Sequence, residues 1–150
     1  MNNIEQTLSI IKPGAVERSL DNEIKEMFKS KGFSINKEKK IQIEKSEAEK
    51  FYKVHETKPF YNDLCAYLSS GPIVVMVLEK ENAVLANREL MGATNPKEAE
   101  KGTIRNEFAE SIEANSVHGS DSLENAKSEI SFFFAEIELN YWILDQKNCH

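Results

Sequence analysis

His118 is the residue whose setting points most directly to chemistry. It stands immediately before Gly119-Ser120-Asp121-Ser122, a sequence that predicts a tight turn followed by the start of a helix. The first backbone N–H groups of a helix have no intrahelical partner and lie at the positive end of the helix dipole, so they stabilise a bound phosphate. A helix N-terminus also favours the neutral imidazole, which is the nucleophilic form. The sequence here therefore predicts a phosphate site with a histidine nucleophile.

Glu129 lies two turns into the helix that is predicted to follow His118. A carboxylate that reaches back to an imidazole nitrogen orients the ring and stabilises the positive charge that forms after nucleophilic attack. Glu129 is therefore a candidate partner of the histidine. On spacing alone, a structural histidine beside a solvent-exposed glutamate is the alternative.

Three cationic residues are candidates for phosphate contacts. Lys12 ends a predicted strand just before Pro13-Gly14, Arg88 lies on an otherwise largely apolar or neutral helix, and Arg105 follows Gly102-Thr103. Arginine forms bidentate contacts with phosphate, whereas lysine acts as a point charge. Taken one at a time, each residue is more often a solvated surface cation than a phosphate ligand.

Three neutral side chains are also candidates for the site, although each has a purely structural alternative. Thr94 lies in a polar loop, and Phe60 and Tyr52 lie on predicted helices. The aromatic pair is typical of helix packing, but a phenylalanine at a helix start can also stack on a nucleobase. No one of these residues is specific by itself.

The elements that must position these residues follow from apolar periodicity and turn signals. The pattern predicts, in chain order, a strand at 7–11, a turn at 12–14, a helix at 21–30, a longer strand at 33–43, two helices carrying Tyr52 and Phe60, a central strand at 73–78, a helix at 82–90, a polar loop at 93–102, a short turn or helix after it, a last short strand at 116–118 and a final helix. This order predicts an α+β fold compatible with the split βαβ arrangement.

Local signals predict where three of these helices begin. Ser46 with Glu49, and Asp121 with Glu124, have capping-box spacing, and Pro59 is expected as the first residue of its helix. The final helix is expected to bury one apolar face, made by Leu123, Ala126, Ile130, Phe133 and Phe134.

Composition limits the class of protein. The chain has 150 residues, 40% of them hydrophobic, and a formal net charge of -6, which predicts one globular domain without general affinity for nucleic acid or anionic membranes. No apolar run approaches the ~20 residues that span a bilayer, and the first residues do not resemble a signal peptide, so we expect a cytoplasmic protein. Cys65 is expected as a free core thiol and Cys149 as a free thiol in the tail, and no Cys/His spacing resembles a zinc site.

Residues 115–122, Asn-Ser-Val-His-Gly-Ser-Asp-Ser, resemble the active-site signature of nucleoside diphosphate kinases. The resemblance extends from about Thr7 to Phe134. Further stretches match in the family's order: Ser-Ile-Ile-Lys-Pro-Gly-Ala-Val at 9–16, Lys-Pro-Phe at 58–60, Ser-Gly-Pro-Ile-Val-Val at 70–75, Arg-Glu-Leu-Met-Gly-Ala-Thr-Asn-Pro at 88–96 and Gly-Thr-Ile-Arg at 102–105.

This resemblance implies an α+β, ferredoxin-like βαββαβ sandwich with an antiparallel sheet and additional helices. It implies a kinase domain at 1–140, followed by a tail at 141–150 whose order is left open, and assembly into a homo-oligomer, either a tetramer or a hexamer. It also implies a ping-pong reaction. A nucleoside triphosphate, mainly ATP, phosphorylates His118, and a nucleoside diphosphate then takes the phosphoryl group.

The resemblance also implies a role for each candidate residue. Lys12, Arg88, Thr94 and Arg105 match phosphate-binding positions, Phe60 matches the residue that stacks on the base, and Asn115 matches the ribose contact; Tyr52, Ser120 and Glu129 match residues that position His118 and the transferred group. Mg²⁺ is expected to arrive with the nucleotide, and no residue is assigned as a direct metal ligand. A catalytically silent scaffold domain and a protein-histidine phosphorelay are the alternative functions.

Three stretches depart from the family pattern. Residues 20–23 lack a frequent glycine, residues 99–102 lack the Pro-Gly pair of many relatives, and residues 141–150 match no pattern. We expect the first to have only a small local effect, because asparagine tolerates unusual backbone angles. The other two bear on loop rigidity and assembly.

Overall fold

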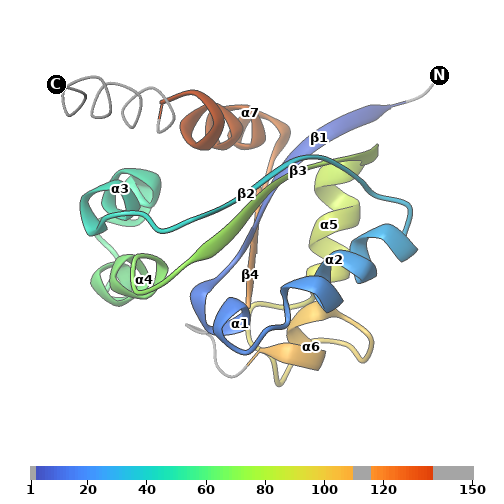
Figure 1. Ribbon diagram of the computed structural model, residues 1–150, viewed down its shortest axis with the longest axis horizontal. Coiled ribbons are helices and arrows are strands. Elements are labelled where there is room, and N and C mark those ends of the chain that lie inside the picture. Colours follow the sequence, from blue (N-terminus) through green and yellow to red (C-terminus); the bar gives the residue numbers. More distant parts are fainter. Residues whose placement is uncertain (1–2, 110–115, 137–150) are drawn as a thin grey trace, which may run out of the picture.

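The computed structural model describes residues 3–109 and 116–136, and a four-stranded antiparallel sheet lies at its centre. Across the sheet the strands follow the order β2-β3-β1-β4 (Figure 1). They are β1 (Ile4–Ile11), β2 (Ser34–Ile41), β3 (Ile73–Glu81) and β4 (Val117–Gly119). This order is that of the ferredoxin-like α+β fold, so the predicted fold class is confirmed.

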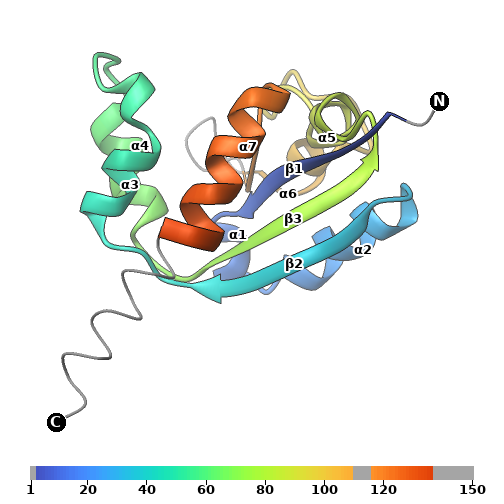
Figure 2. The ribbon, with the colours of Figure 1, turned by 90° about the horizontal axis from the view of Figure 1, so that it is seen from above.

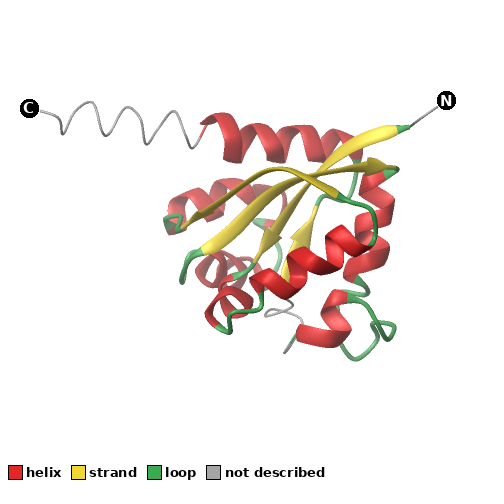
Figure 3. Cartoon of the chain, turned by 45° about the vertical axis from the view of Figure 1, so that its right-hand side comes forward, coloured by secondary structure: helices red, strands yellow, loops and turns green. Residues whose placement is uncertain are grey.

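Helices cover both faces of this sheet (Figure 3). They are α1 (Pro13–Glu17), α2 (Asp21–Ser30), α3 (Lys45–Phe51), α4 (Tyr61–Leu68), α5 (Ala83–Met91), α6 (Ile104–Phe108) and α7 (Leu123–Ser131), with a 3₁₀ turn at Lys53–His55 and a π-helical turn at Phe132–Glu136. In the described residues, no helix has both the length and the apolar character needed to cross a membrane.

Strand β3 divides the hydrophobic core into two halves, because alternate side chains of a strand point to opposite faces. Val74 and Met76 pack with α2 and α5, whereas Ile73 and Val75 pack with α3, α4 and Phe133. Figure 2 shows α7 crossing β1 on one face of the sheet, with α2 on the other side of the sheet near β2. The sequence signal for this strand, an unbroken apolar β-branched run, is confirmed by full burial of residues 73–78.

The predicted second strand is shorter in the structure, Ser34–Ile41 rather than 33–43. Its pairing with β3 shifts between Ile35 and Lys37, so Asn36 forms a bulge. The predicted turn at 12–14 leads directly into the short helix α1, with Pro13 in its first turn. A proline is suited to that position because it lacks the N–H that would be unpaired there.

The three predicted helix starts are all displaced. Helix α3 is capped by Glu44, whose backbone N–H donates to Glu47 Oε1 at 3.0 Å, rather than by Ser46. Helix α4 begins after Phe60, not at Pro59. Ser122, not Asp121, caps α7, and its Oγ accepts from the Asn125 backbone N–H at 3.0 Å. Several side chains within each stretch can cap a helix, and only the extended backbone at Glu44 and Ser122 decides which does.

The apolar face predicted for the last helix is correct except at its start. Ala126 and Phe133 are fully buried, but Leu123 is 42% exposed. The first turn of α7 therefore carries its leucine away from the sheet, and the buried face begins at Ala126. Cys65 is a buried free thiol, as expected. Cys149 and the tail at 141–150 lie outside the described residues.

Candidate active site

The strand pair β1–β4 positions His118. Val117 and His118 pair with Ile11 and Ile10, so the imidazole projects from the backbone of an anchored strand. One residue beyond the strand, Ser120 exchanges two contacts with Leu8: its backbone N–H donates to the Leu8 carbonyl at 3.2 Å, and its Oγ accepts from the Leu8 N–H at 3.2 Å. The turn into α7 is therefore fixed to β1.

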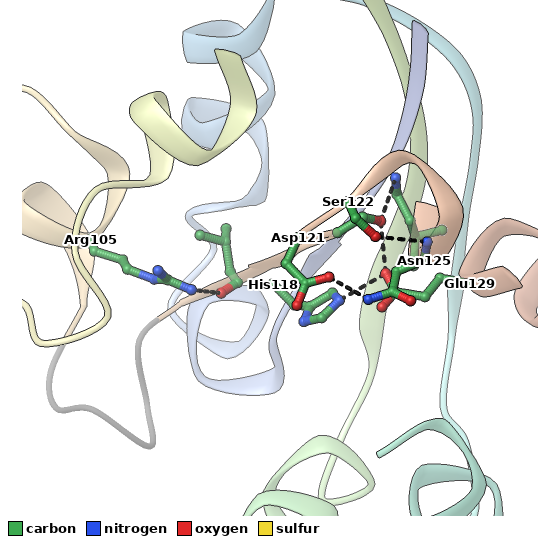
Figure 4. Close-up of polar contacts among 9 residues, drawn as sticks. Arg105, His118, Asp121, Ser122, Asn125 and Glu129 are labelled. Carbon is green, nitrogen blue, oxygen red and sulfur yellow. Dashed lines mark hydrogen bonds and ion pairs between the residues drawn. The ribbon is translucent and has the colours of Figure 1, made fainter. Parts of the chain in front are cut away.

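Glu129 returns from α7 to meet the histidine, as the sequence predicts (Figure 4). His118 Nε2 lies 3.1 Å from Glu129 Oε1, and the Ser120 hydroxyl donates to the same oxygen at 2.7 Å. Ser120 is fully buried, and the His118 and Glu129 side chains are each about four-fifths buried, with 20% and 19% exposed. The structure thus brings three of the predicted residues into one hydrogen-bonded group.

This contact assigns different roles to the two imidazole nitrogens. An ionised carboxylate only accepts hydrogen bonds, so Nε2 must carry the proton that lies between it and Glu129. In a neutral ring the lone pair is then on Nδ1. This arrangement leaves the Nδ1 lone pair free of the contact with Glu129, and a carboxylate at Nε2 could stabilise an imidazolium.

Two aromatic side chains of the α3 region pack against the imidazole. The centroid of the Phe51 ring lies 5.1 Å from that of the His118 ring, and the centroid of the Tyr52 ring lies 6.2 Å from it. Both rings meet the imidazole edge to face. Burial raises the pKa of the Tyr52 hydroxyl, and its oxygen has no hydrogen-bond partner among the described residues. The sequence alone did not single out Phe51, because nothing in the local pattern separates the roles of two adjacent aromatics.

Arg105 lies half-buried beside the histidine strand. Its Nη1 donates to the Gly92 carbonyl at 3.0 Å and its Nη2 to the Val117 carbonyl at 3.1 Å. Burial, and then the nearby positive charge of Arg88, lower the pKa of Arg105 to about 10, so the guanidinium stays charged at neutral pH. Arg88, on α5, contacts the turn before α7, where its Nη1 donates to the Asp121 carbonyl at 3.3 Å.

A cavity of about 220 Å³ lies where these groups meet. Arg88 and Arg105 line it together with Thr94, which is exposed, and Gly119, which adjoins His118. Close packing of β4 against α5 favours glycine at 119, because a Cβ there would collide with the Asn87 side chain and lie 2.6 Å from Met91 Cε. Two arginines in a small polar hollow next to an imidazole make a site for an anionic, phosphate-like group.

Lys12 lies at the end of β1, where its backbone N–H donates to the Ser116 carbonyl at 2.8 Å. Its side chain is only 3% exposed. Burial, and then the charge of Arg105, lower the pKa of Lys12 to about 7. The positive charge of Arg105 acts on Lys12, so the structure brings these two predicted cations together. Burial and this charge both disfavour the ammonium form of Lys12.

Phe60 lies apart from this buried group, at the start of α4. Its side chain is 45% exposed, and Val54, in the turn before it, is 83% exposed. An aromatic face that remains open to solvent is suited to stacking. Asn115, the predicted ribose contact, lies outside the described residues.

Two other cavities are larger. One of about 450 Å³ shares Arg88 with the site above but also carries Glu89, Glu98 and Glu100, whose negative charges make it less suited to a phosphate. The second, of about 300 Å³, is lined by Lys31, Lys80 and Lys101 together with Glu89, and it shares no lining residue with the cavity beside His118. Residues 3–109 and 116–136 hold no group of three or more His, Cys, Asp or Glu side chains that could bind a metal ion.

Comparison with known proteins identifies the family of this site. The family model described as nucleoside diphosphate kinase matches residues 5–139. A nucleoside diphosphate kinase from Nitratiruptor sp. is 62% identical over 136 residues, which cover 91% of this chain and 99% of that protein. One from Campylobacter fetus is 61% identical, with the same coverage.

Solved structures agree with the sequence relatives. The nucleoside diphosphate kinase of Aquifex aeolicus superposes with a TM-score of 0.86 at 39% identity and covers 90% of this chain and 98% of its own. That of Encephalitozoon cuniculi has a TM-score of 0.83 at 35% identity, covering 85% and 87%. The match in sequence over most of the chain, together with the match in fold, shows that this chain belongs to the nucleoside diphosphate kinase family.

Proposed function

We propose that His118 Nδ1 carries the phosphoryl group between nucleotides in a ping-pong reaction. The lone pair on Nδ1 forms a bond to the γ-phosphorus of a nucleoside triphosphate. The bond from that phosphorus to the β–γ bridging oxygen breaks, and its electron pair leaves with the diphosphate. A second diphosphate attacks the phosphohistidine through its terminal oxygen and returns the electron pair to Nδ1. The observation that carries this proposal is the contact of Nε2 with Glu129, which leaves Nδ1 available.

Three cations, of which Lys12 is buried, Arg105 half-buried and Arg88 exposed, supply the electrostatics of this transfer. The cavity next to His118 is lined by Arg88, Arg105 and Thr94. Lys12 does not line it but is close enough to Arg105 for the two charges to interact. A triphosphate carries about four negative charges, and phosphoryl transfer asks mainly for positioning and charge stabilisation. Glu129 and Ser120 hold the ring, Phe51 and Tyr52 pack against it, and the imidazolium formed after attack is balanced by Glu129.

The nucleoside extends from the phosphates toward α4. Exposed Phe60 stacks on the base, and Asn115 contacts the ribose. Stacking uses a face that every base has, so we expect weak discrimination among bases. One site then serves the donor and the acceptor nucleotide in turn.

Mg²⁺ fits this site as a companion of the nucleotide. Asp121 is the carboxylate among the residues that line the cavity, and it is the side chain there that would hold an ion carried by the phosphates. A bound Mg²⁺ would supply charge neutralisation to the nucleotide.

The test of this proposal is phosphoenzyme formation. Incubation of the protein with ATP labelled in the γ-phosphate and Mg²⁺ is expected to give a labelled protein whose label is acid-labile and stable in base. Addition of GDP or a deoxynucleoside diphosphate is then expected to remove the label as the corresponding triphosphate. Absence of label from a protein that is folded by circular dichroism would contradict the proposal.

Nucleotide binding is expected to take up a proton above pH 7. Lys12 has a pKa of about 7 in the free protein, so at pH 8 it is mostly neutral. The phosphates raise that pKa, because a nearby negative charge favours the ammonium form. Calorimetry at pH 8 in buffers of different ionisation enthalpy should therefore show up to about one proton bound per nucleotide, falling at pH 6 where Lys12 is already charged.

By the same linkage, the affinity for nucleotide falls as the pH rises above about 7, because the complex then needs a proton that free Lys12 lacks. Lys12→Met removes the titrating group and should abolish this proton uptake. Uptake that is unchanged in the variant would assign the proton to another group.

We also propose a cytoplasmic location and assembly into a tetramer or hexamer. In support, no described helix could span a membrane, and Ile4, Leu85 and Leu123 are apolar side chains exposed on the isolated chain. Light scattering on the purified protein distinguishes the two assembly sizes from each other and from a monomer.

A further inference from the structure

Arg18 ends the short helix α1, and its side chain contacts this helix and two segments that are remote in the sequence. Its Nη2 donates to the Phe108 carbonyl at 2.6 Å and lies 3.5 Å from Ser116 Oγ, and its Nε donates to the Gly14 carbonyl at 3.3 Å. The side chain is exposed and is not among the residues that line the cavity beside His118. It is therefore a connector rather than a ligand of the transferred group.

Each contacted segment carries one residue of the proposed machinery. Gly14 follows the buried Lys12, Phe108 ends the helix that carries Arg105, and Ser116 precedes the strand that carries His118. Arginine is suited to this junction because its planar fork presents several charged donors at fixed angles, and hydrogen bonds from charged donors are stronger than neutral ones.

Two of the groups that Arg18 contacts, at Gly14 and Ser116, are also held by other parts of the structure. The Gly14 N–H donates to Tyr67 Oη at 2.9 Å, so the peptide groups around Gly14 are held by α4 on one side and by Arg18 on the other. Ser116 is buried, with φ of 73°, a left-handed conformation that is unfavourable for a residue with a side chain. Such a conformation persists only where the surroundings hold it.

We propose that Arg18 is a positioning residue for phosphoryl transfer, which acts by holding the turn after Lys12, the end of α6 and the start of β4 at fixed distances from one another. This inference rests on the proposed role of His118. Convergence of Lys12, Arg105 and His118 depends on three segments that are far apart in the sequence, and small errors in such an arrangement are costly for catalysis.

The test compares Arg18→Met, which keeps the length of the side chain and removes the guanidinium, with Arg18→Lys, which keeps the charge. Glu17→Gln, at the exposed neighbouring position on α1, is the matched control. The rate of His118 phosphorylation by ATP is measured in a single turnover, per folded protein, well below the Tm of each variant. We expect about a tenfold fall for Arg18→Met, an intermediate rate for Arg18→Lys and the parental rate for Glu17→Gln.

A merely structural role gives a different result. It would lower the Tm of Arg18→Met but leave the phosphorylation rate per folded molecule within twofold of the parent, and this outcome would overturn the inference. If Arg18→Met does not fold, Arg18→Lys decides in the same way: a parental rate overturns the inference and a reduced one supports it. A parent protein that forms no phosphoenzyme would refute the proposed function itself, whereas an active parent with equally active variants would refute only the role of Arg18.

Discussion

Replacement of His118 by asparagine is expected to lower kcat/KM by at least about 10⁴-fold, because the variant has no nucleophile to form the covalent intermediate. The hydrogen bond from the Ser120 hydroxyl to Glu129 Oε1, 2.7 Å long in the parent protein, does not involve residue 118 and should remain in the variant. The fold should therefore persist. The measurement is transfer from ATP to GDP, together with phosphoenzyme formation from labelled ATP, in protein shown to be folded by its circular dichroism.

His55→Asn is the matched control for this prediction. His55 lies in the turn between α3 and α4, and its ring centroid is 6.4 Å from that of Tyr52, without a contact to Glu129 among those of the described residues. This variant should still form phosphoenzyme. If His118→Asn retained parental transfer, or if label appeared on His55 instead, the assignment of the carrier would be wrong.

Replacement of Lys12 by methionine is expected to lower kcat/KM by about 100- to 1,000-fold, the usual effect of removing one preorganised charge stabiliser from a buried site. Unlike most losses of a buried residue, this one should not lower the Tm at pH 7. Folding lowers the pKa of Lys12 to about 7, so the folded state disfavours the charged ammonium that the unfolded chain carries without penalty.

The sign of this stability effect sets its pH dependence. Between pH 7 and the ordinary lysine pKa of 10.5, the unfolded chain binds more protons at Lys12 than the folded protein does, so stability of the parent rises with pH over that range. Lys12→Met should remove this rise and match or exceed the parent in Tm at pH 7. Lys29→Met, at an exposed position on α2, is the control, and it should change neither the activity nor the pH profile. A Lys12→Met protein with parental kcat/KM would contradict the assignment.

The sequence predicts the core of this fold well because the signals are local. An unbroken apolar run predicts β3, and helical spacing predicts α2 with its observed bounds at Asp21–Ser30. The starts of α3 and α7 fail for a physical reason: in each of these two stretches, more than one side chain can accept a hydrogen bond from the first turn. The choice of Glu44 over Ser46, and of Ser122 over Asp121, depends on backbone angles that the rest of the fold imposes.

Some residues of the candidate site can likewise be found from the sequence, and others only from the structure. Its chemical groups and their family order can be read from the sequence, and the predicted approach of Glu129 to His118 is confirmed at 3.1 Å. Phe51 could not be assigned to the site, because its contact with the imidazole joins α3 to β4 across the sheet. Arg18 could not be found either, since its three contacts join segments separated by up to about a hundred positions.

The sequence by itself determined which chemistry this protein carries: a histidine in the signature at 115–122, the cations that accompany it and the family to which they belong. Only the tertiary structure decided how those groups are used. It places Glu129 at Nε2 of His118, which is the basis for proposing Nδ1 as the carrier, and it lowers the pKa of Lys12 by burying it beside Arg105. The reason is that hydrogen-bond geometry and desolvation depend on distances between strands and helices that are remote in the chain, and no local sequence pattern specifies those distances.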